Sequence, residues 1–170
     1  DLARSSSEGG LVRGTADMEV ALGRLAWQRG DAAASAHHLD RAAELGEGAG
    51  LPQQPYRWRV AMADLRAAAG DWSGADALLE EAERLYVGDF APNVRPVRAS
   101  RARLWVRAGD LAAARGWARE RGLSPHDDVS YAREYEQVTL VRVLLAEHRQ
   151  SGKPAGRADA LHLLGTALLQ

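Results

Sequence analysis

Apolar residues recur at intervals of three and four along most of the chain, which is the period of a helix with one buried face. Between positions 75 and 85, for example, Ala75, Leu78, Leu79, Ala82 and Leu85 share one helical face. No long stretch shows the two-residue alternation that indicates a strand. The pattern predicts eight helices, at 17–30, 32–45, 56–69, 72–86, 94–108, 111–121, 129–150 and 156–169.

The dipeptide Gly-Asp recurs between predicted helices, at 30–31, 70–71 and 109–110, with spacings of 40 and 39 residues. Glycine can adopt the left-handed conformation that ends a helix, and an aspartate side chain can cap the next one. We therefore interpret Gly-Asp as a structural corner. A fixed period of this length indicates a stack of helix-turn-helix repeats.

Alignment on these corners places a small residue of each first helix opposite a small residue of the second, followed four positions later by an apolar residue. The three aligned sets are Gly23, Ser35 and Leu39; Ala63, Ala75 and Leu79; and Ala102, Ala114 and Ala118. Small residues at these positions let two antiparallel helices approach closely, as in tetratricopeptide repeats. The sequence predicts an all-α fold, a right-handed superhelical stack of about four antiparallel helix pairs.

The fourth unit begins near Tyr131, and the sequence QSGKPAG (150–156) looks like an insertion that opens its corner. Joints between units are rich in Gly, Pro and Asp, and their prolines limit where the next helix can start. We expect residues 1–14 to be loose and residues 15–170 to form a single repeat domain, a fragment of a larger protein.

Composition narrows the functional classes. The 170 residues carry a net charge of −1, which gives no general attraction for nucleic acid or an anionic membrane. There is no cysteine, which excludes disulfides and thiolate sites. No apolar run is long enough to span a bilayer, and the first ten residues lack the apolar core of a signal peptide. We expect a cytoplasmic protein that does not bind nucleic acid directly.

Candidate catalytic chemistry is weak everywhere in the sequence. The phosphate-loop motif fails at 152–154, where Gly-Lys is followed by Pro. Neighbouring histidines at 37–38 diverge by roughly 100° on a helix and cannot easily share a metal ion. The acidic pair at 80–81 fits a polar helix face, and the pair at 127–128 fits the start of the seventh helix. We therefore expect no enzyme, no cofactor and no metal.

A candidate binding surface follows from the repeat frame, that is, from the position of each residue within its aligned repeat. The first helices of such units line the concave wall of the stack. One frame position carries Arg24, Asp64, Arg103 and Arg142, and neighbouring inward positions carry Trp27, Gln28, Arg57, Arg107 and Tyr135. Guanidinium groups beside aromatic rings suit a polar or anionic ligand. Alternatively, the arginines only solvate an exposed face, with Arg24 and Asp64 as an ion pair between repeats.

The remaining tryptophans are predicted to pack between helices, namely Trp58, Trp72, Trp105 and Trp117. Several phrases are far more specific than a generic repeat pattern, especially PYRWRVAM, RLYVGDF and SYAREYEQVTLVRVLLA. Through them, nearly all of residues 15–170 resembles the tetratricopeptide-like sensor region of large ATP-binding, LuxR-type (MalT-like) bacterial transcriptional regulators.

This resemblance implies a signal-sensing domain that binds a small-molecule effector or a regulatory protein. In that family an ATPase module precedes the repeats in the same parent chain, and a DNA-binding domain follows them. The alternative is a protein-protein interaction scaffold that holds a peptide or partner helix in its concave groove. Self-association through the apolar faces of the terminal helices is a further expectation.

Overall fold

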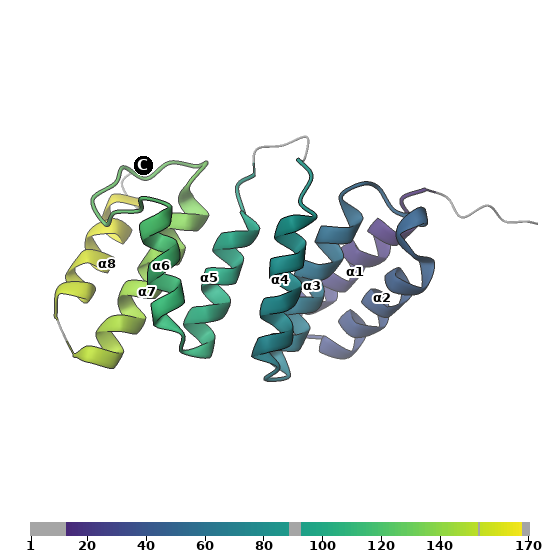
Figure 1. Cartoon of the computed structure of the whole chain (residues 1–170), viewed down its shortest axis with the longest axis horizontal. Coiled ribbons are helices and arrows are strands. Elements are labelled where there is room, and N and C mark those ends of the chain that lie inside the picture. Colours follow the sequence, from purple (N-terminus) through teal and green to yellow (C-terminus); the bar gives the residue numbers. More distant parts are fainter. Residues whose placement is uncertain (1–12, 89–92, 153, 168–170) are drawn as a thin grey trace, which may run out of the picture.

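The computed structural model describes residues 13–88, 93–152 and 154–167. Within these residues the chain is helical, with eight α-helices and one short 3₁₀ turn. The elements are α1 (Thr15–Gln28), α2 (Ala32–Leu45), η1 (Glu47–Ala49), α3 (Gln54–Ala68), α4 (Trp72–Arg84), α5 (Val97–Ala108), α6 (Leu111–Glu120), α7 (Glu134–Ser151) and α8 (Pro154–Ala167). Consecutive helices form four antiparallel pairs that stack side by side (Figure 1). The predicted all-α repeat stack is confirmed.

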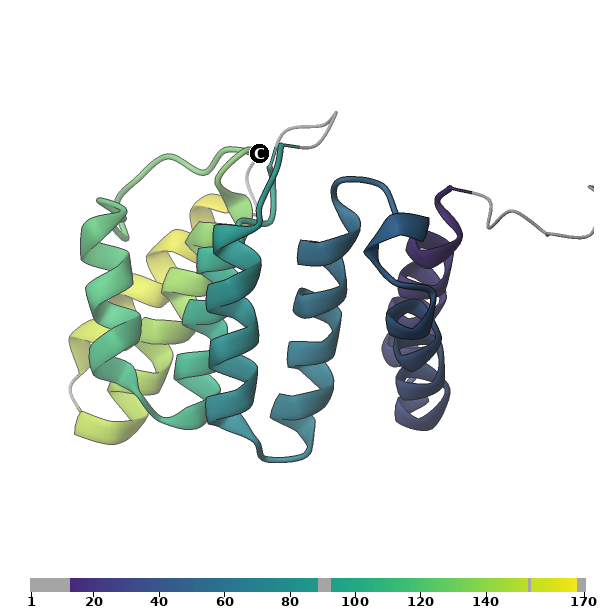
Figure 2. The ribbon, with the colours of Figure 1, turned by 45° about the vertical axis from the view of Figure 1, so that its right-hand side comes forward.

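The short corners within pairs lie at one end of the stack, and the longer joints between pairs lie at the opposite end (Figures 1 and 2). At the corners, Gly30, Gly70 and Gly109 adopt φ values of 81°, 82° and 85°, which is the left-handed region. The aspartate after each glycine accepts a hydrogen bond from the backbone N–H three residues on, at 2.9–3.0 Å. The predicted structural role of Gly-Asp is confirmed.

The small residues of the three aligned units are buried and allow the helices of each pair to meet closely. At Gly23 the helices leave little room, because a Cβ atom there would lie 3.0 Å from Cγ of Leu39. The tryptophans pack as predicted: Trp58 donates a hydrogen bond to the carbonyl oxygen of Leu39, Trp117 is buried, and Trp72 and Trp105 lie against core clusters.

Two predictions about the fourth unit are wrong. First, α7 begins at Glu134 rather than at 129, and the acidic pair at 127–128 does not start it. Instead, the Asp127 carboxylate accepts a hydrogen bond from the backbone N–H of Ser124 and stabilises a turn in the loop. Second, the corner is not opened, because α7 continues to Ser151 and α8 begins at Pro154.

Residues of the predicted insertion form the end of α7 and the start of α8. The Ser151 hydroxyl donates to the carbonyl oxygen of Glu147 in the last turn of α7, and Gly152 ends the helix with φ at 69°. Proline is favoured at the first position of a helix, where its missing N–H costs nothing, so α8 starts directly afterwards. The expectation that 1–14 is loose concerns residues that lie mostly outside the described part, as do the last residues of the predicted final helix.

The pairing of α7 with α8 depends on the absence of a side chain at Gly156. A Cβ atom there would lie 2.9 Å from the carbonyl oxygen of Leu144, so the backbones would have to separate. We expect Gly156→Ala to lower the free energy of unfolding by about 1–2 kcal/mol, as overpacking does. Gly116→Ala is the matched control in α6: a Cβ atom there meets nothing within 4 Å. It should stabilise by about 0.5–1 kcal/mol through helix propensity. Equal shifts of the two variants in thermal unfolding would contradict this account of the α7–α8 contact.

The second and third units are joined mainly through α4 and α5. Arg101 of α5 forms two hydrogen bonds to the Asp76 carboxylate of α4, at 2.7 and 2.8 Å, and a further ion pair to Glu80 at 3.1 Å. The indole N–H of Trp105 also donates to Asp76, at 2.8 Å. The Arg101 side chain is the main reason that the pKa of Asp76 lies below its usual value. We call Asp76, Glu80, Arg101 and Trp105 the α4–α5 clamp.

The clamp predicts a pH-dependent stability. A carboxylate whose folded pKa is depressed stabilises the fold fully above its unfolded pKa of 3.8, and loses this contribution as pH falls through the folded pKa. We expect Asp76→Asn to cost about 1–2 kcal/mol at pH 7 and progressively less below pH 4. Urea unfolding from pH 7 to pH 3 measures this difference. A difference between wild type and variant that stayed constant with pH would contradict the prediction.

The outer faces of the two terminal helices expose large apolar side chains. These are Met18, Leu22 and Leu25 on α1, and Leu161 and Leu164 on α8. Such faces lie on the inside of the stack in the central units, where neighbouring helices cover them. Self-association through these faces stays a prediction.

Candidate ligand-binding groove

A groove of about 630 Å³ lies between α3 and α5 and reaches α1 on one side and α7 on the other. It forms because α5 packs against α4 and α7, and has little contact with α3. Part of its floor is aromatic: the rings of Tyr56 and Tyr86 meet edge to face, with centroids 5.1 Å apart. The groove therefore sits at the joint between the second and third units, where a change of inter-unit angle would open or close it.

Most of the residues predicted from the repeat frame line this groove. They are Arg24, Arg57, Asp64, Arg103, Arg107, Tyr135 and Arg142. Trp27 and Gln28 are not part of its lining, because they occupy the last turn of α1, near the corner end of the stack. The repeat frame thus selects residues from four different helices that come together in space.

Arg103 lies close enough to Arg95 and Arg142 to be repelled by both, and we call Arg95, Arg103 and Arg142 the arginine cluster. Cζ of Arg103 lies 3.6 Å from the centroid of the Tyr135 ring, and Cζ of Arg95 lies 5.8 Å from it. Arg103 is also held by its Nε, which donates to Oγ1 of Thr139 at 2.8 Å. The stacked and hydrogen-bonded Arg103 is thus fixed in orientation before any ligand arrives.

No carboxylate of the described residues neutralises the arginine cluster. In the described part of the chain none of its three members forms an ion pair with a carboxylate, whereas Arg101 and Arg121, outside the groove, are paired. Burial lowers the pKa of Arg103, and repulsion from Arg142 and Arg95 lowers it further, against the favourable effect of Tyr135. Arginine stays protonated nonetheless, so the cluster presents positive charge to the groove that is not paired with any carboxylate of the described chain.

Hydrogen-bond acceptors lie elsewhere along the groove. The Asp64 side chain lies in the concave wall but is still reached by solvent. Partial burial raises the pKa of its carboxyl group, and the positive charges of Arg107 and Arg24 act in the opposite direction. No direct Arg24–Asp64 ion pair forms between these two described residues, contrary to the alternative interpretation of the sequence. Oδ1 of Asp17 is buried without a hydrogen-bond partner among the described residues, 3.6 Å from Nη1 of Arg57.

Sequence reasoning missed part of the lining, notably Asp17, Tyr56, Tyr86, Arg95 and Ser100. Arg95 and Tyr86 lie in the joint between α4 and α5. Helical periodicity does not apply there, so it cannot predict which way their side chains point. One signal was available, because Pro96 fixes the start of α5 and leaves Arg95 directly before it, at the same end of the stack as the first residues of α7.

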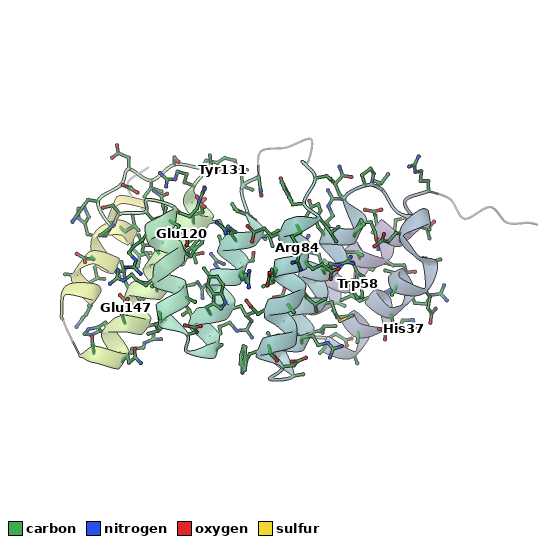
Figure 3. The ribbon with its side chains drawn as sticks, in the orientation of Figure 1. His37, Trp58, Arg84, Glu120, Tyr131 and Glu147 are labelled. Atoms are coloured by element: carbon green, nitrogen blue, oxygen red, sulfur yellow. The ribbon has the colours of Figure 1, made fainter. Side chains whose placement is uncertain are left out.

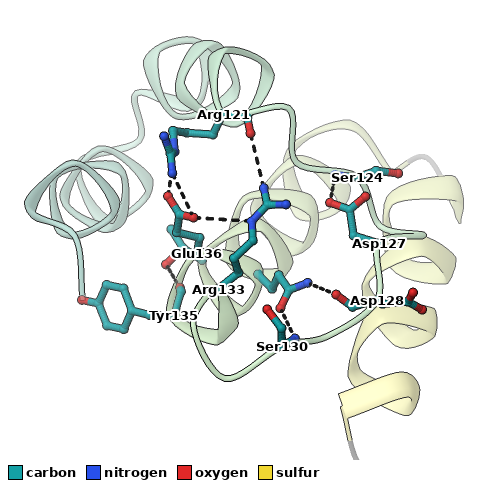
Figure 4. Close-up of polar contacts among 10 residues, drawn as sticks. Arg121, Ser124, Asp127, Asp128, Ser130, Arg133, Tyr135 and Glu136 are labelled. Carbon is teal, nitrogen blue, oxygen red and sulfur yellow. Dashed lines mark hydrogen bonds and ion pairs between the residues drawn. The ribbon is translucent and has the colours of Figure 1, made fainter. Parts of the chain in front are cut away.

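A polar network surrounds the start of α7, next to Tyr135 in the sequence (Figure 4). The buried Glu136 accepts a hydrogen bond from Nε of Arg121 at 2.8 Å and forms a longer ion pair, 3.8 Å, with Nε of Arg133. Arg133 in turn donates to the carbonyl oxygen of Arg121. The Gln137 side chain bonds the backbone of the preceding loop at two points. The loop and the first turn of α7 are therefore connected into one unit next to the arginine cluster.

Other candidate chemistry resolves into structural contacts. His37 is exposed on α2 (Figure 3), and Nδ1 of His38 lies 2.8 Å from the Glu19 carboxylate. Glu80 and Glu81 form ion pairs with arginines. Across 13–88, 93–152 and 154–167, no three His, Cys, Asp or Glu residues are grouped so as to hold a metal ion. In the same segments, no helix has the length and apolar character needed to cross a bilayer.

Four helix pairs with a basic concave groove define a tetratricopeptide-like repeat domain. The family model for the MalT-like TPR region matches residues 1–167, so the chain belongs to this family. Comparison with curated proteins and with solved structures gave no match.

Proposed function

We propose that this chain is the signal-sensing domain of a LuxR-type, ATP-dependent bacterial transcriptional regulator, and that its concave groove binds a polar or anionic effector. The arginine cluster carries this proposal. Three guanidinium groups from two repeat units line one groove and repel one another around Arg103 without a carboxylate partner in the described chain, and an anion would relieve this repulsion. Membership in the MalT-like TPR family supports the sensing role. The domain acts in the cytoplasm and has no catalytic activity of its own.

The position of the groove supports a mechanism. Ligand bound between α3 and α5 would favour one angle between the second and third units, while the α4–α5 clamp joins the same two units through a different pair of helices. In a stack where each unit touches only its neighbours, a rotation at one joint is passed to both ends. Ligand binding would reach the ATPase and DNA-binding domains of the parent chain in this way.

A thermal-shift screen of the purified domain tests the proposal, with sugars, sugar phosphates, nucleotides and organic acids as the panel. A ligand at 100 times its dissociation constant adds about 2.7 kcal/mol of stability. We expect saturable stabilisation by at least one anionic compound, and its loss in Arg103→Gln. Stabilisation that is equal in wild type and Arg103→Gln would contradict binding at the arginine cluster.

A protein partner is the second candidate, because residues of α1, α3, α5 and α7 all line the groove. An acidic peptide would use the same arginines. Binding of a peptide without saturable binding of any small molecule would favour this function over the first.

A further inference from the structure

A second groove, of about 780 Å³, follows the surface between α5 and α7. Its apolar wall is contributed by Val106, Leu111, Val138, Val141, Leu145 and Ala146, and Arg107, Arg142, Arg149 and Gln150 border this wall. Val106, Arg107 and Arg142 line both this groove and the first one. The two grooves therefore meet at a pair of arginines, with a charged compartment on one side and, on the other, an apolar wall with Arg149 and Gln150 at its edge.

From this junction we infer that the effector is an amphiphilic organic anion. Its anionic group binds the arginine cluster, and its aliphatic chain lies in the apolar groove between α5 and α7. The inference rests on the proposed function and specifies the chemical class of the effector.

The charge distribution favours an amphiphile over a purely polar or a purely apolar ligand. A purely polar anion fills the first groove and leaves the apolar wall between α5 and α7 in contact with water. A neutral apolar ligand covers that wall but leaves Arg95, Arg103 and Arg142 without a counter-charge from the described residues. An anion with an aliphatic chain satisfies both compartments in one molecule.

Arg142 has the right position to connect the two parts of such a ligand. It lies on α7 between Val138 and Ala146, one helical turn from each, and both of these residues line the apolar groove. The aliphatic stem of an arginine packs on apolar surface while its guanidinium reaches toward charge. The same side chain therefore borders the aliphatic chain and contacts the anionic group.

Isothermal titration of the whole chain with decanoate, 1-decanol and butyrate separates the two contributions. Decanoate carries both the charge and the aliphatic chain, 1-decanol lacks the charge, and butyrate lacks most of the chain. We expect decanoate to bind at least tenfold more tightly than either of the others. Decanoate that binds no better than 1-decanol or butyrate would overturn the inference.

Two variants test whether the aliphatic chain of the ligand lies in the apolar groove. Ala146→Phe fills the apolar groove without changing its charge, and Ala112→Phe is the control on an exposed position of α6. Val138→Thr keeps the shape of the wall but makes it polar, and serves if the larger substitution disturbs the fold. We expect Ala146→Phe to remove the preference for decanoate over butyrate and Val138→Thr to reduce it several-fold. Unchanged decanoate affinity in the folded variants would overturn the inference.

Failure of this inference differs from failure of the proposed function. If small polar anions bind in an Arg103-dependent manner and decanoate has no advantage, the sensing groove stands and the amphiphile is wrong. If an acidic peptide binds in an Arg103-dependent manner and decanoate does not bind, the occupant is a protein and the amphiphile is also wrong.

Discussion

Replacing Arg103 with glutamine is expected to weaken binding of an anionic effector by about 10- to 100-fold, since a hydrogen bond to a charged group contributes about 1.5–3 kcal/mol. Arg103 is the member of the arginine cluster that stacks directly on Tyr135 and bonds to Thr139. Glutamine retains a hydrogen-bond donor but removes the charge. Isothermal titration of wild type and variant with an anionic ligand from the thermal-shift screen measures the change.

The matched control for this variant is Arg41→Gln, on an exposed position of α2 outside the groove. It changes the net charge by the same amount and is expected to leave affinity within about twofold, because charges beyond a Debye length of about 10 Å are screened. Arg103→Lys keeps the charge and loses the planar set of donors, so its affinity should fall between wild type and Arg103→Gln. Equal losses in Arg103→Gln and Arg41→Gln would show that only overall charge matters.

Replacing Arg121 with alanine is expected to lower the free energy of unfolding by about 2–3 kcal/mol. Glu136 has only 3 % of its side chain exposed, and Arg121 is the closer of its two arginine partners. Loss of Arg121 leaves a buried carboxylate that is paired with Arg133 alone. Removing one partner of a buried ion pair costs about 3–5 kcal/mol, and the remaining Arg133 and the partial exposure of Arg121 reduce the effect. Urea denaturation at neutral pH measures it.

Arg119→Ala is the control, because Arg119 is an exposed arginine in the last turn of α6 and its loss should change stability by no more than about 0.5 kcal/mol. Glu136→Gln removes the buried charge itself and should cost less than Arg121→Ala. If Arg121→Ala and Arg119→Ala had the same small effect, the network in Figure 4 would not stabilise the start of α7.

Helix positions and corners were predictable because each Gly-Asp dipeptide has a local physical cause, a left-handed glycine followed by a capping aspartate. The fourth unit lacks this dipeptide, and there the prediction started α7 too early, at 129 instead of Glu134, and expected an opened corner after it. Its start depends on Arg121, Glu136 and Gln137, which connect residues that are distant in sequence. Such contacts leave no periodic pattern for the sequence to reveal.

The groove was partly predictable for a similar reason. Arg24, Asp64, Arg103 and Arg142 occupy one position of the repeat, and periodicity assigns them all to the inner wall. Arg95 was missed because it belongs to a joint, where direction is set by the folded loop. The apolar groove between α5 and α7 was also not predicted, since periodicity marks its residues as apolar without showing that a gap lies beside them.

Hydrogen exchange tests most directly whether the concave groove is the sensing site. It would be measured by mass spectrometry with and without a saturating anionic ligand from the thermal-shift screen. The account predicts slower exchange in peptides covering α3, α5 and the first turns of α7, and no change in the middle of α2. Protection confined to α2 and α6, or to the outer faces of α1 and α8, would contradict it.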